Sequence, residues 1–308
     1  MRATGRLVTL GLVGAALVAG CGPGESSPPA ALRAAGTAPA AVATPPATPS
    51  TGRYVALGSS FAAGTGIGPD MGGGCGRSAR NYPHLLADRL GLDLVDATCG
   101  GATTANLSSA PQRGHPPQID VLTADARLVT VTVGGNDLRY SAATVVCANA
   151  AAADRPCTSL PSPEETARAA VTLRTDLVRL FGEIRSKAPN ARMLLVTYPR
   201  VFPDPAATCA GNVISTGDSG TLAAMGAILQ ETFRLVAADT GVLLVDTYSA
   251  STGHDVCAPA ADRWVEGSDA TGLRYHPNAA GAAAISTLIA RALTDPTIAT
   301  TGPTPTST

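Results

Sequence analysis

The sequence predicts an α/β protein, a single-domain three-layer α/β/α sandwich with a central, mostly five-stranded parallel sheet. Short, continuously apolar runs of strand length occur along the middle of the chain, and longer segments with helical spacing separate them. Apolar residues make up 45% of the 308 residues, enough for a sizeable core. The formal net charge of −1 leaves no cationic surplus for a phosphate backbone, so nucleic acid is not an expected partner.

The first twenty residues have the pattern of an export signal. Arg2 and Arg6 precede the apolar run Leu7–Ala19, which is too short to span a bilayer. Small residues lead into Cys21 and resemble a bacterial lipobox, which implies cleavage before Cys21 and lipidation of its thiol. An ordinary signal peptide with an incidental cysteine is the alternative. We expect an exported monomer, held by lipid at the outer face of the cytoplasmic membrane or released from it.

Two segments lack the large apolar side chains that a folded core needs. Residues 21–52 contain the Cys21 anchor followed by Pro, Ala, Thr, Ser and Gly, and residues 296–308 are similar. Such segments bury too little surface to offset their ordering entropy, so we expect a disordered tether and a disordered tail. The folded domain is then expected at residues 53–295.

Six cysteines remain after Cys21. In an exported chain an even number favours disulfides over metal ligands, and six cysteines allow 15 pairings. We favour pairing between nearest neighbours. No C-x-x-C or H-x-x-x-H spacing supports a zinc site, and no metal is expected. The favoured pairs are Cys75–Cys99, Cys147–Cys157 and Cys209–Cys257.

The expected strands are apolar without alternation, which is typical of parallel strands covered on both faces. They are Tyr54–Leu57, Leu92–Val95, Leu128–Val133, Met193–Thr197 and Val242–Val245.

The clearest helix is expected between Ser162 and Pro189. Ser162 can cap it, Pro163 occupies its first position, and Glu165 completes a capping box. Further helices are expected over Tyr82–Leu90, Thr221–Ala238 and Pro277–Leu293, and a short one after Ser60.

In a parallel doubly wound sheet, ligands bind beyond the carboxyl ends of the strands. Four loops at that edge carry polar or glycine-rich sequences. A serine at a sharp corner, paired glycines, a side-chain amide and a histidine at a helix start suit nucleophilic chemistry, although each alone is more typical of a turn or helix cap. The candidates are Ser60, Gly101, Asn136 and His276.

These four segments resemble the SGNH (GDSL) hydrolase superfamily, in its exported actinobacterial esterase/lipase branch. The matching blocks follow the family order and are Tyr54–Gly64, Cys99–Thr104, Gly134–Asp137 and His276–Gly281. The resemblance implies the flavodoxin-like fold of that superfamily. It also implies a serine esterase or lipase without metal or organic cofactor, in which Ser60 attacks an acyl ester and His276 is the base. Ser60, Gly101 and Asn136 would form the oxyanion hole.

Two positions depart from the family pattern. Ser59 replaces the Asp of Gly-Asp-Ser, and Leu273 replaces the Asp three residues before the histidine. A Leu side chain cannot orient an imidazole, so we expect the Leu273 backbone carbonyl to orient His276 in a Ser–His dyad. Asp269 is the alternative orienting group.

The substrate expected by default is a short-to-medium-chain acyl ester, and a phospholipid or host lipid stays open. An acyltransferase with the same dyad and a non-catalytic envelope lipoprotein are the alternatives to a hydrolase.

Overall fold

The computed structural model describes residues 52–270 and 272–295. The expected signal peptide, the tether up to residue 51, Cys21 and the tail lie outside the described residues. Within them, five parallel strands form one sheet in the order β2-β1-β3-β4-β5, and each overlaps its predicted apolar run. This is the strand order of flavodoxin-like doubly wound folds. The strands are β1 (Arg53–Gly58), β2 (Asp93–Asp96), β3 (Ala126–Thr132), β4 (Arg192–Val196) and β5 (Leu243–Val245).

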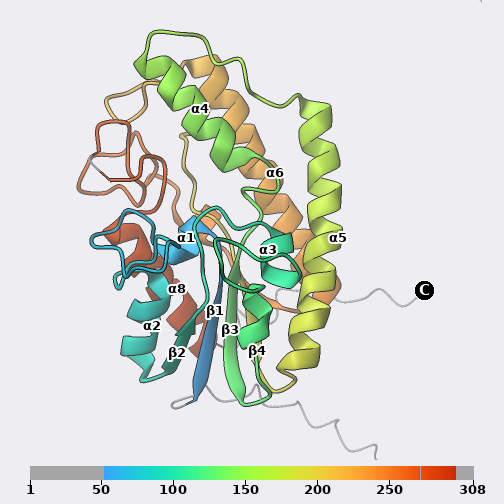
Figure 1. Cartoon of the computed structure of the whole chain (residues 1–308). Helices are drawn as coiled ribbons and strands as arrows, with labels where there is room; N and C mark the ends of the chain where they lie inside the picture. The colour runs from blue at the N-terminus through green and yellow to red at the C-terminus, as the bar shows by residue number, and fades with distance from the viewer. Residues whose placement is uncertain (1–51, 271, 296–308) are drawn as a thin grey trace, which may run out of the picture. The chain divides into compact units, whose positions relative to one another are not determined.

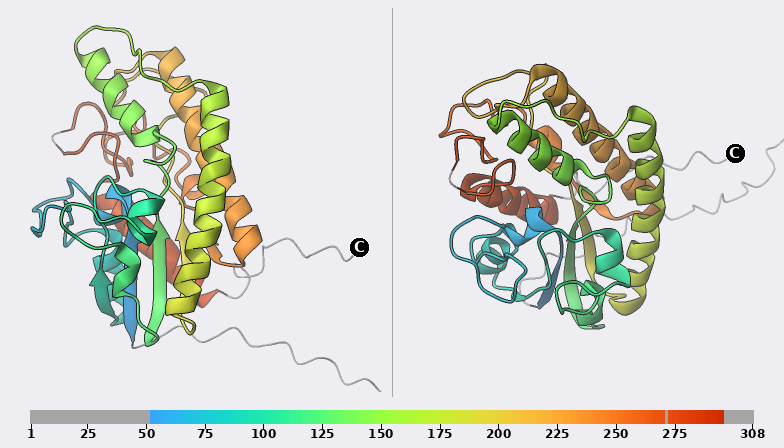
Figure 2. Two further views of the ribbon diagram at one scale, coloured as in Figure 1. Left: turned by 45° about the vertical axis from the view of Figure 1, so that its right-hand side comes forward. Right: turned by 45° about the horizontal axis from the view of Figure 1, so that its top comes forward.

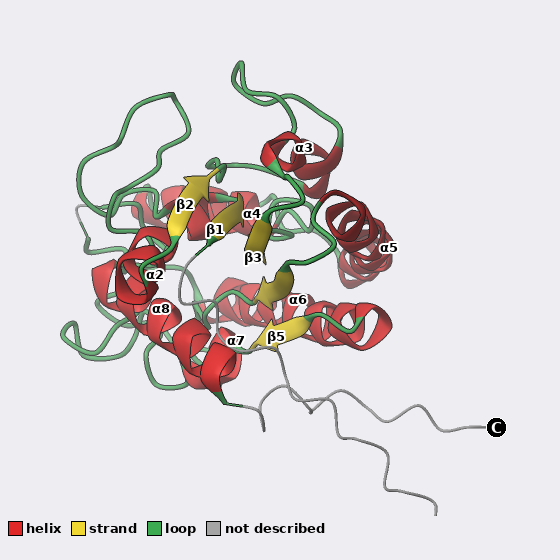
Figure 3. Ribbon diagram, turned by 90° about the horizontal axis from the view of Figure 1, so that it is seen from below, coloured by secondary structure: helices red, strands yellow, loops and turns green. Residues whose placement is uncertain are grey.

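Helices cover both faces of this sheet (Figure 1). Figure 3 shows α2 (Tyr82–Leu90) and α8 (Ala279–Thr294) on one side of the row of strands. On the other side lie α3 (Thr104–Ser108), α5 (Pro163–Lys187) and α6 (Thr216–Thr240). The three-layer prediction is therefore confirmed. The shorter elements are α1 (Ser60–Ala63), the 3₁₀ helix η1 (Gln118–Val121) and α7 (Thr247–Ala250), and α4 covers Tyr140–Ala152.

The absence of alternation along the strands has a direct structural cause. Val55 and Leu57 of β1 pack into the cluster under α3, α5 and α6, whereas Tyr54 and Ala56 pack into the cluster under α2 and α8. Both sets are fully buried. Successive side chains of a strand point to opposite faces, so a strand with a core on each face needs apolar residues at every position.

The predicted capping box at the start of α5 forms. The Ser162 hydroxyl accepts a hydrogen bond from the Glu165 N–H at 3.2 Å, and the Glu165 carboxylate accepts one from the Ser162 N–H at 2.7 Å. Helix α6 starts at Thr216, earlier than expected, because the Ser215 hydroxyl caps the Asp218 N–H. Helix α4 was not predicted: small and apolar residues lie all around it, so its sequence has no amphipathic period.

Helix α4 and the loops that follow the strands lie beyond the carboxyl ends of the sheet (Figures 1 and 2). The loop after α1 and the loop before α8, far apart in sequence, approach each other there. The position that a Cβ atom would take on Gly66 lies 2.7 Å from the Leu273 nitrogen. No helix in residues 52–270 and 272–295 combines the length and apolar character needed to cross a membrane.

Candidate active site

Ser60 lies at a sharp corner between β1 and α1. The Ser59 N–H donates to the Thr132 carbonyl at 2.9 Å, which ends β1 against β3. Gly58 has a φ of +155°, and a Cβ there would lie 2.5 Å from the Thr132 carbonyl oxygen, so only glycine fits this turn. The corner directs Ser60 toward the carboxyl edge of the sheet, where it is 6% exposed.

His276 comes from the loop just before α8 and reaches the same place. Its Nε2 lies 2.9 Å from the Ser60 Oγ, although the two residues are 216 positions apart. The loop is held by two backbone hydrogen bonds of 2.8 Å, from the Tyr275 N–H to the Glu266 carbonyl and from the Glu266 N–H to the His276 carbonyl. The imidazole also packs against the Phe61 ring, with 4.8 Å between centroids.

The expectation about the group that orients His276 needs a correction. Its Nδ1 lies 3.1 Å from the Arg274 carbonyl oxygen, so the partner is Arg274 and not Leu273. Tyr275 has a φ of +61°, and this left-handed residue turns the preceding carbonyl toward the ring. The Asp269 alternative is also contradicted, because that carboxylate pairs with the Arg263 guanidinium at 2.8 and 3.1 Å.

Burial controls the protonation of His276. The ring is 5% exposed, and desolvation lowers its pKa from 6.5 to about 4, while the hydrogen bond to the Arg274 carbonyl raises it by a smaller amount. The imidazole is therefore neutral at neutral pH. With Nδ1–H donating to Arg274, its Nε2 has a lone pair for the Ser60 hydroxyl.

The glycine block lies beside Ser60. The position that a Cβ atom would take on Gly100 lies 4.0 Å from the Ser60 Cβ. The Gly100 N–H donates to the Cys75 carbonyl at 2.8 Å. Among the described residues, the N–H groups of Ser60 and Gly101 have no hydrogen-bond acceptor, so both are open to an incoming oxyanion.

Asn136 lies against the same block. Its Nδ2 donates to the Ala102 carbonyl at 2.8 Å, which fixes the amide at this loop. The neighbouring Asp137 accepts hydrogen bonds from the Thr104 N–H at 3.0 Å and the Thr104 hydroxyl at 2.6 Å. These bonds tie the asparagine loop to the start of α3, and burial raises the pKa of the Asp137 carboxyl.

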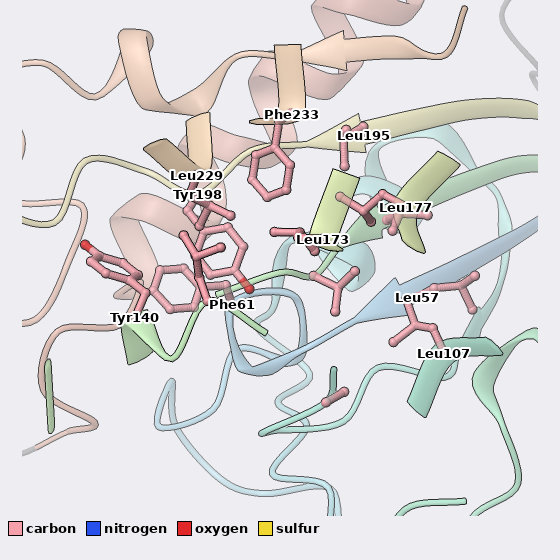
Figure 4. Packing of buried hydrophobic residues seen from close by; sticks show 14 of the residues in the cluster. Leu57, Phe61, Leu107, Tyr140, Leu173, Leu177, Leu195, Tyr198, Leu229 and Phe233 are labelled. Carbon is pink, nitrogen blue, oxygen red and sulfur yellow. The ribbon is translucent and has the colours of Figure 1, made fainter. Parts of the chain in front are cut away.

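Tyr198 is a site residue that sequence reasoning missed. Its hydroxyl lies 2.8 Å from the Ser59 hydroxyl and accepts a hydrogen bond from the Gly135 N–H at 3.2 Å. Its ring packs on Phe61 at 4.2 Å, and Figure 4 shows both at one end of the apolar cluster. Its position just after β4 was the available signal, since that strand also ends at this edge of the sheet.

Comparison with known proteins agrees with this geometry. Residues 56–284 match the model of the GDSL-like lipase/acylhydrolase family. The chain belongs to this family. It is 35% identical over 243 residues to Lipase 2 of Streptomyces coelicolor, covering 74% of this chain and 81% of that protein.

Solved structures support the same assignment for this GDSL-like hydrolase. It aligns with phospholipase A1 from Streptomyces albidoflavus at a TM-score of 0.59 and 26% identity, covering 77% of this chain and 97% of that one. The extracellular lipase of Streptomyces rimosus shares the fold at a TM-score of 0.61 and 24% identity, with 78% and 99% covered. The protein is thus a carboxylic ester hydrolase with the SGNH fold.

All three expected disulfides of the hydrolase form. They join Cys75 to Cys99, Cys147 to Cys157 and Cys209 to Cys257. The first borders the corner that carries Ser60: the Cys75 carbonyl accepts from the Gly100 N–H, and the Cys99 N–H donates to the Gly58 carbonyl at 3.0 Å. This bridge therefore links the glycine block to the loop after α1.

Two of the other three histidines of this hydrolase, His84 and His254, have structural partners outside the site. His84 Nδ1 lies 2.8 Å from the side chain of the helix-capping residue Asn81, and His254 Nδ1 lies 2.6 Å from the Asp262 carbonyl. Within residues 52–270 and 272–295, no group of three or more His, Cys, Asp or Glu side chains is placed to hold a metal ion.

Proposed function

We propose that this hydrolase cleaves acyl esters through a Ser60–His276 dyad and a covalent acyl-enzyme. The observation that carries the proposal is the 2.9 Å separation between the Ser60 Oγ and the His276 Nε2. A serine hydroxyl is a weak nucleophile at neutral pH and needs an adjacent base, and a neutral imidazole within hydrogen-bond distance is that base. The Arg274 carbonyl takes the orienting role that an acid has in a triad.

In the first half-reaction, the Ser60 Oγ bonds to the ester carbonyl carbon while His276 takes the hydroxyl proton. The negative charge moves to the carbonyl oxygen, which the N–H groups of Ser60 and Gly101 and the Asn136 amide would stabilise. His276 then gives its proton to the departing alcohol, leaving Ser60 acylated. In the second half-reaction, a water oxygen bonds to the acyl carbon while His276 takes its proton. The bond from that carbon to the Ser60 Oγ then breaks, His276 returns the proton to Oγ, and the carboxylic acid leaves.

The substrate proposal follows from the relatives. Lipases of Streptomyces and a phospholipase A1 are similar to this chain, and acyl esters of lipids are the substrates that those names describe. We therefore propose a short-to-medium-chain acyl ester as the substrate, with the lipid esters of an envelope included.

The direct test compares Ser60→Ala with Asp269→Asn on p-nitrophenyl esters of increasing acyl length. Ser60→Ala should remove nearly all hydrolysis and all labelling by a fluorophosphonate probe, because the attacking oxygen is gone. Asp269→Asn is the matched control: its carboxylate pairs with Arg263, so kcat should stay within a few-fold of wild type. A folded Ser60→Ala protein with wild-type turnover would disprove the nucleophile. A loss of about 10⁴-fold in kcat for Asp269→Asn would instead show that Asp269 acts as the acid of a Ser–His–Asp triad.

We also propose that Cys21 carries a lipid that holds the hydrolase at the outer face of the cytoplasmic membrane. The support is the small-residue sequence before Cys21, which lies outside the described residues. Mass spectrometry of the mature N-terminus should find a diacylglyceryl group on Cys21, and Cys21→Ser should move the protein from the membrane fraction to the medium. An unmodified Cys21 within the mature chain would contradict the anchor.

A further inference from the structure

Three basic side chains gather around one exposed loop segment, Gly73–Gly74, in the loop after α1. The Arg113 Nη1 donates to the Gly74 carbonyl at 2.7 Å, and the His115 Nε2 lies 2.7 Å from the Gly73 carbonyl. The position that a Cβ atom would take on Gly73 lies 3.4 Å from the Arg77 Nη2. We call Arg77, Arg113 and His115 the basic cluster. Arg77 and Arg113 carry a permanent positive charge.

The basic cluster borders the glycine block of the active site. Arg113 lies at the tip of a tight turn closed by two backbone hydrogen bonds between Gln112 and His115, and its φ is +50°. The Gln112 Nε2 donates to the Gly100 carbonyl at 3.1 Å, which fixes the turn on the block. As a result, the position of a Cβ atom on Gly101 lies 3.9 Å from the Arg113 Nη2. The Arg113 guanidinium is therefore next to the proposed oxyanion donor.

Among the residues that the structure describes, this cluster has no carboxylate partner. None of the ion pairs among the described residues includes Arg77 or Arg113. The Arg77 Nη1 donates to the backbone carbonyl of Asp96, whose carboxylate accepts from Asn81 and Thr98. The nearby Asp70 carboxylate accepts from the Gly72 N–H at 2.8 Å. The Arg113 Nη2 is thus available to an anion, and the side chain is exposed to reach one.

We propose that Arg113 is a specificity-determining residue that selects ester substrates carrying an anionic group, a phosphate or a carboxylate, a few bonds from the scissile carbonyl. A Cβ atom on Gly100 would lie 4.0 Å from the Ser60 Cβ, and one on Gly101 would lie 3.9 Å from the Arg113 Nη2, so the guanidinium lies beside the glycine block that borders Ser60. A substrate whose carbonyl oxygen is held at the Gly101 N–H can therefore place an attached anion against Arg113. Guanidinium groups bind both phosphate and carboxylate oxygens through paired N–H donors. This inference rests on the ester hydrolysis proposed above.

The experiment measures kcat/KM for two matched substrate pairs at low ionic strength. Dioleoyl phosphatidic acid and dioleoylglycerol in neutral detergent micelles differ by an anion on the alcohol side. The p-nitrophenyl monoester of adipic acid and p-nitrophenyl hexanoate differ by a carboxylate on the acyl side. The variants are Arg113→Gln and, as a control, Arg127→Gln, because the exposed Arg127 is at the amino end of β3, the opposite edge of the sheet.

Wild type should prefer the anionic member of at least one pair. Arg113→Gln should reduce that preference about 5- to 10-fold. The loss is larger than that of a typical surface ion pair and smaller than that of a charged hydrogen bond in a fully buried site. Arg127→Gln should leave it unchanged, and 0.5 M salt should weaken it in wild type. The pair that responds shows whether the site recognises a phosphate on the alcohol side or a carboxylate on the acyl side.

Two outcomes overturn the inference: no anionic preference in either pair, or a preference that Arg113→Gln leaves intact. Both leave the proposed function standing if the neutral esters are still hydrolysed and the fluorophosphonate probe still labels Ser60. A wild-type protein that neither labels nor hydrolyses any of the four substrates would instead refute the proposed function itself.

Discussion

His276 is almost completely removed from water, and this determines how the protein should respond to acid. Only the neutral imidazole can take the Ser60 proton, and desolvation lowers its pKa to about 4. The value of kcat/KM should therefore stay high through pH 5 and fall by half near pH 4, in contrast to the fall between 6 and 7 that an exposed histidine would produce.

A pH–rate profile on a neutral p-nitrophenyl ester measures this directly. The same pKa shift affects stability. In the unfolded chain His276 binds a proton below about pH 6.5, whereas in the folded protein it binds one only below about pH 4. Protonation of His276 therefore lowers the free energy of unfolding as the pH falls from about 6.5 to about 4. For this reason, circular dichroism must confirm at each pH that the protein is still folded. A rate that halves near pH 6.5 in the folded state would show that the ring is charged more easily than its burial implies.

At the scale of elements, Tyr198 joins the corner after β1 to the loop after β3. Its hydroxyl lies within hydrogen-bond distance of the Ser59 hydroxyl and accepts a hydrogen bond from the Gly135 N–H, and all three residues are buried. Tyr198→Phe would leave two buried polar groups without partners, so we expect a loss of about 1–3 kcal/mol of unfolding free energy and a lower kcat.

Denaturant unfolding and ester kinetics test the Tyr198 prediction. Tyr140→Phe is the matched control: it is buried in the same cluster (Figure 4), and its hydroxyl makes no hydrogen bond to any residue that the structure describes. That variant should keep wild-type stability within a few tenths of a kcal/mol. Equal effects in both variants would mean that the Tyr198 bridge contributes nothing beyond ring packing.

At the scale of the whole molecule, the disulfides connect segments outside the strands: Cys75–Cys99 joins two loops, and Cys147–Cys157 joins helix α4 to the loop that follows it. Cys75–Cys99 and Cys147–Cys157 close loops of 24 and 10 residues. Replacing either pair with alanines should cost about 2–4 kcal/mol of stability, because the unfolded chain regains freedom. Only the first replacement should also lower kcat, since that bridge lies against the glycine block.

Thermal unfolding and ester kinetics of the two double variants separate these effects. The Cys147/Cys157 double variant should unfold at a lower temperature and turn over substrate at the wild-type rate below that temperature. A kcat loss of equal size in both variants would show that the bridges act on the site only through global stability.

Much of this hydrolase could be predicted from its sequence alone. Continuous apolarity along the strands follows from burial on both faces, and a parallel sheet then places every loop after a strand at one edge. That logic was enough to select Ser60, Asn136 and His276 as candidates. The cysteine pairs were predicted separately, from the even number of cysteines in an exported chain and the preference for nearest neighbours. The capping box of α5 is equally local, since Ser162 and Glu165 lie within one turn.

Tertiary structure decided what depends on backbone direction and on contacts between distant segments. The partner of His276 changed from Leu273 to Arg274 because the positive φ of Tyr275 turns a carbonyl, and sequence spacing does not specify that angle. The low pKa of His276 and the bridging role of Tyr198 arise from burial by several loops together. Arg113 borders the site only because a tight turn is fixed on the glycine block. The local pattern of apolar and polar residues indicates which side chains are buried. The orientation of one group toward another depends instead on how the whole chain packs.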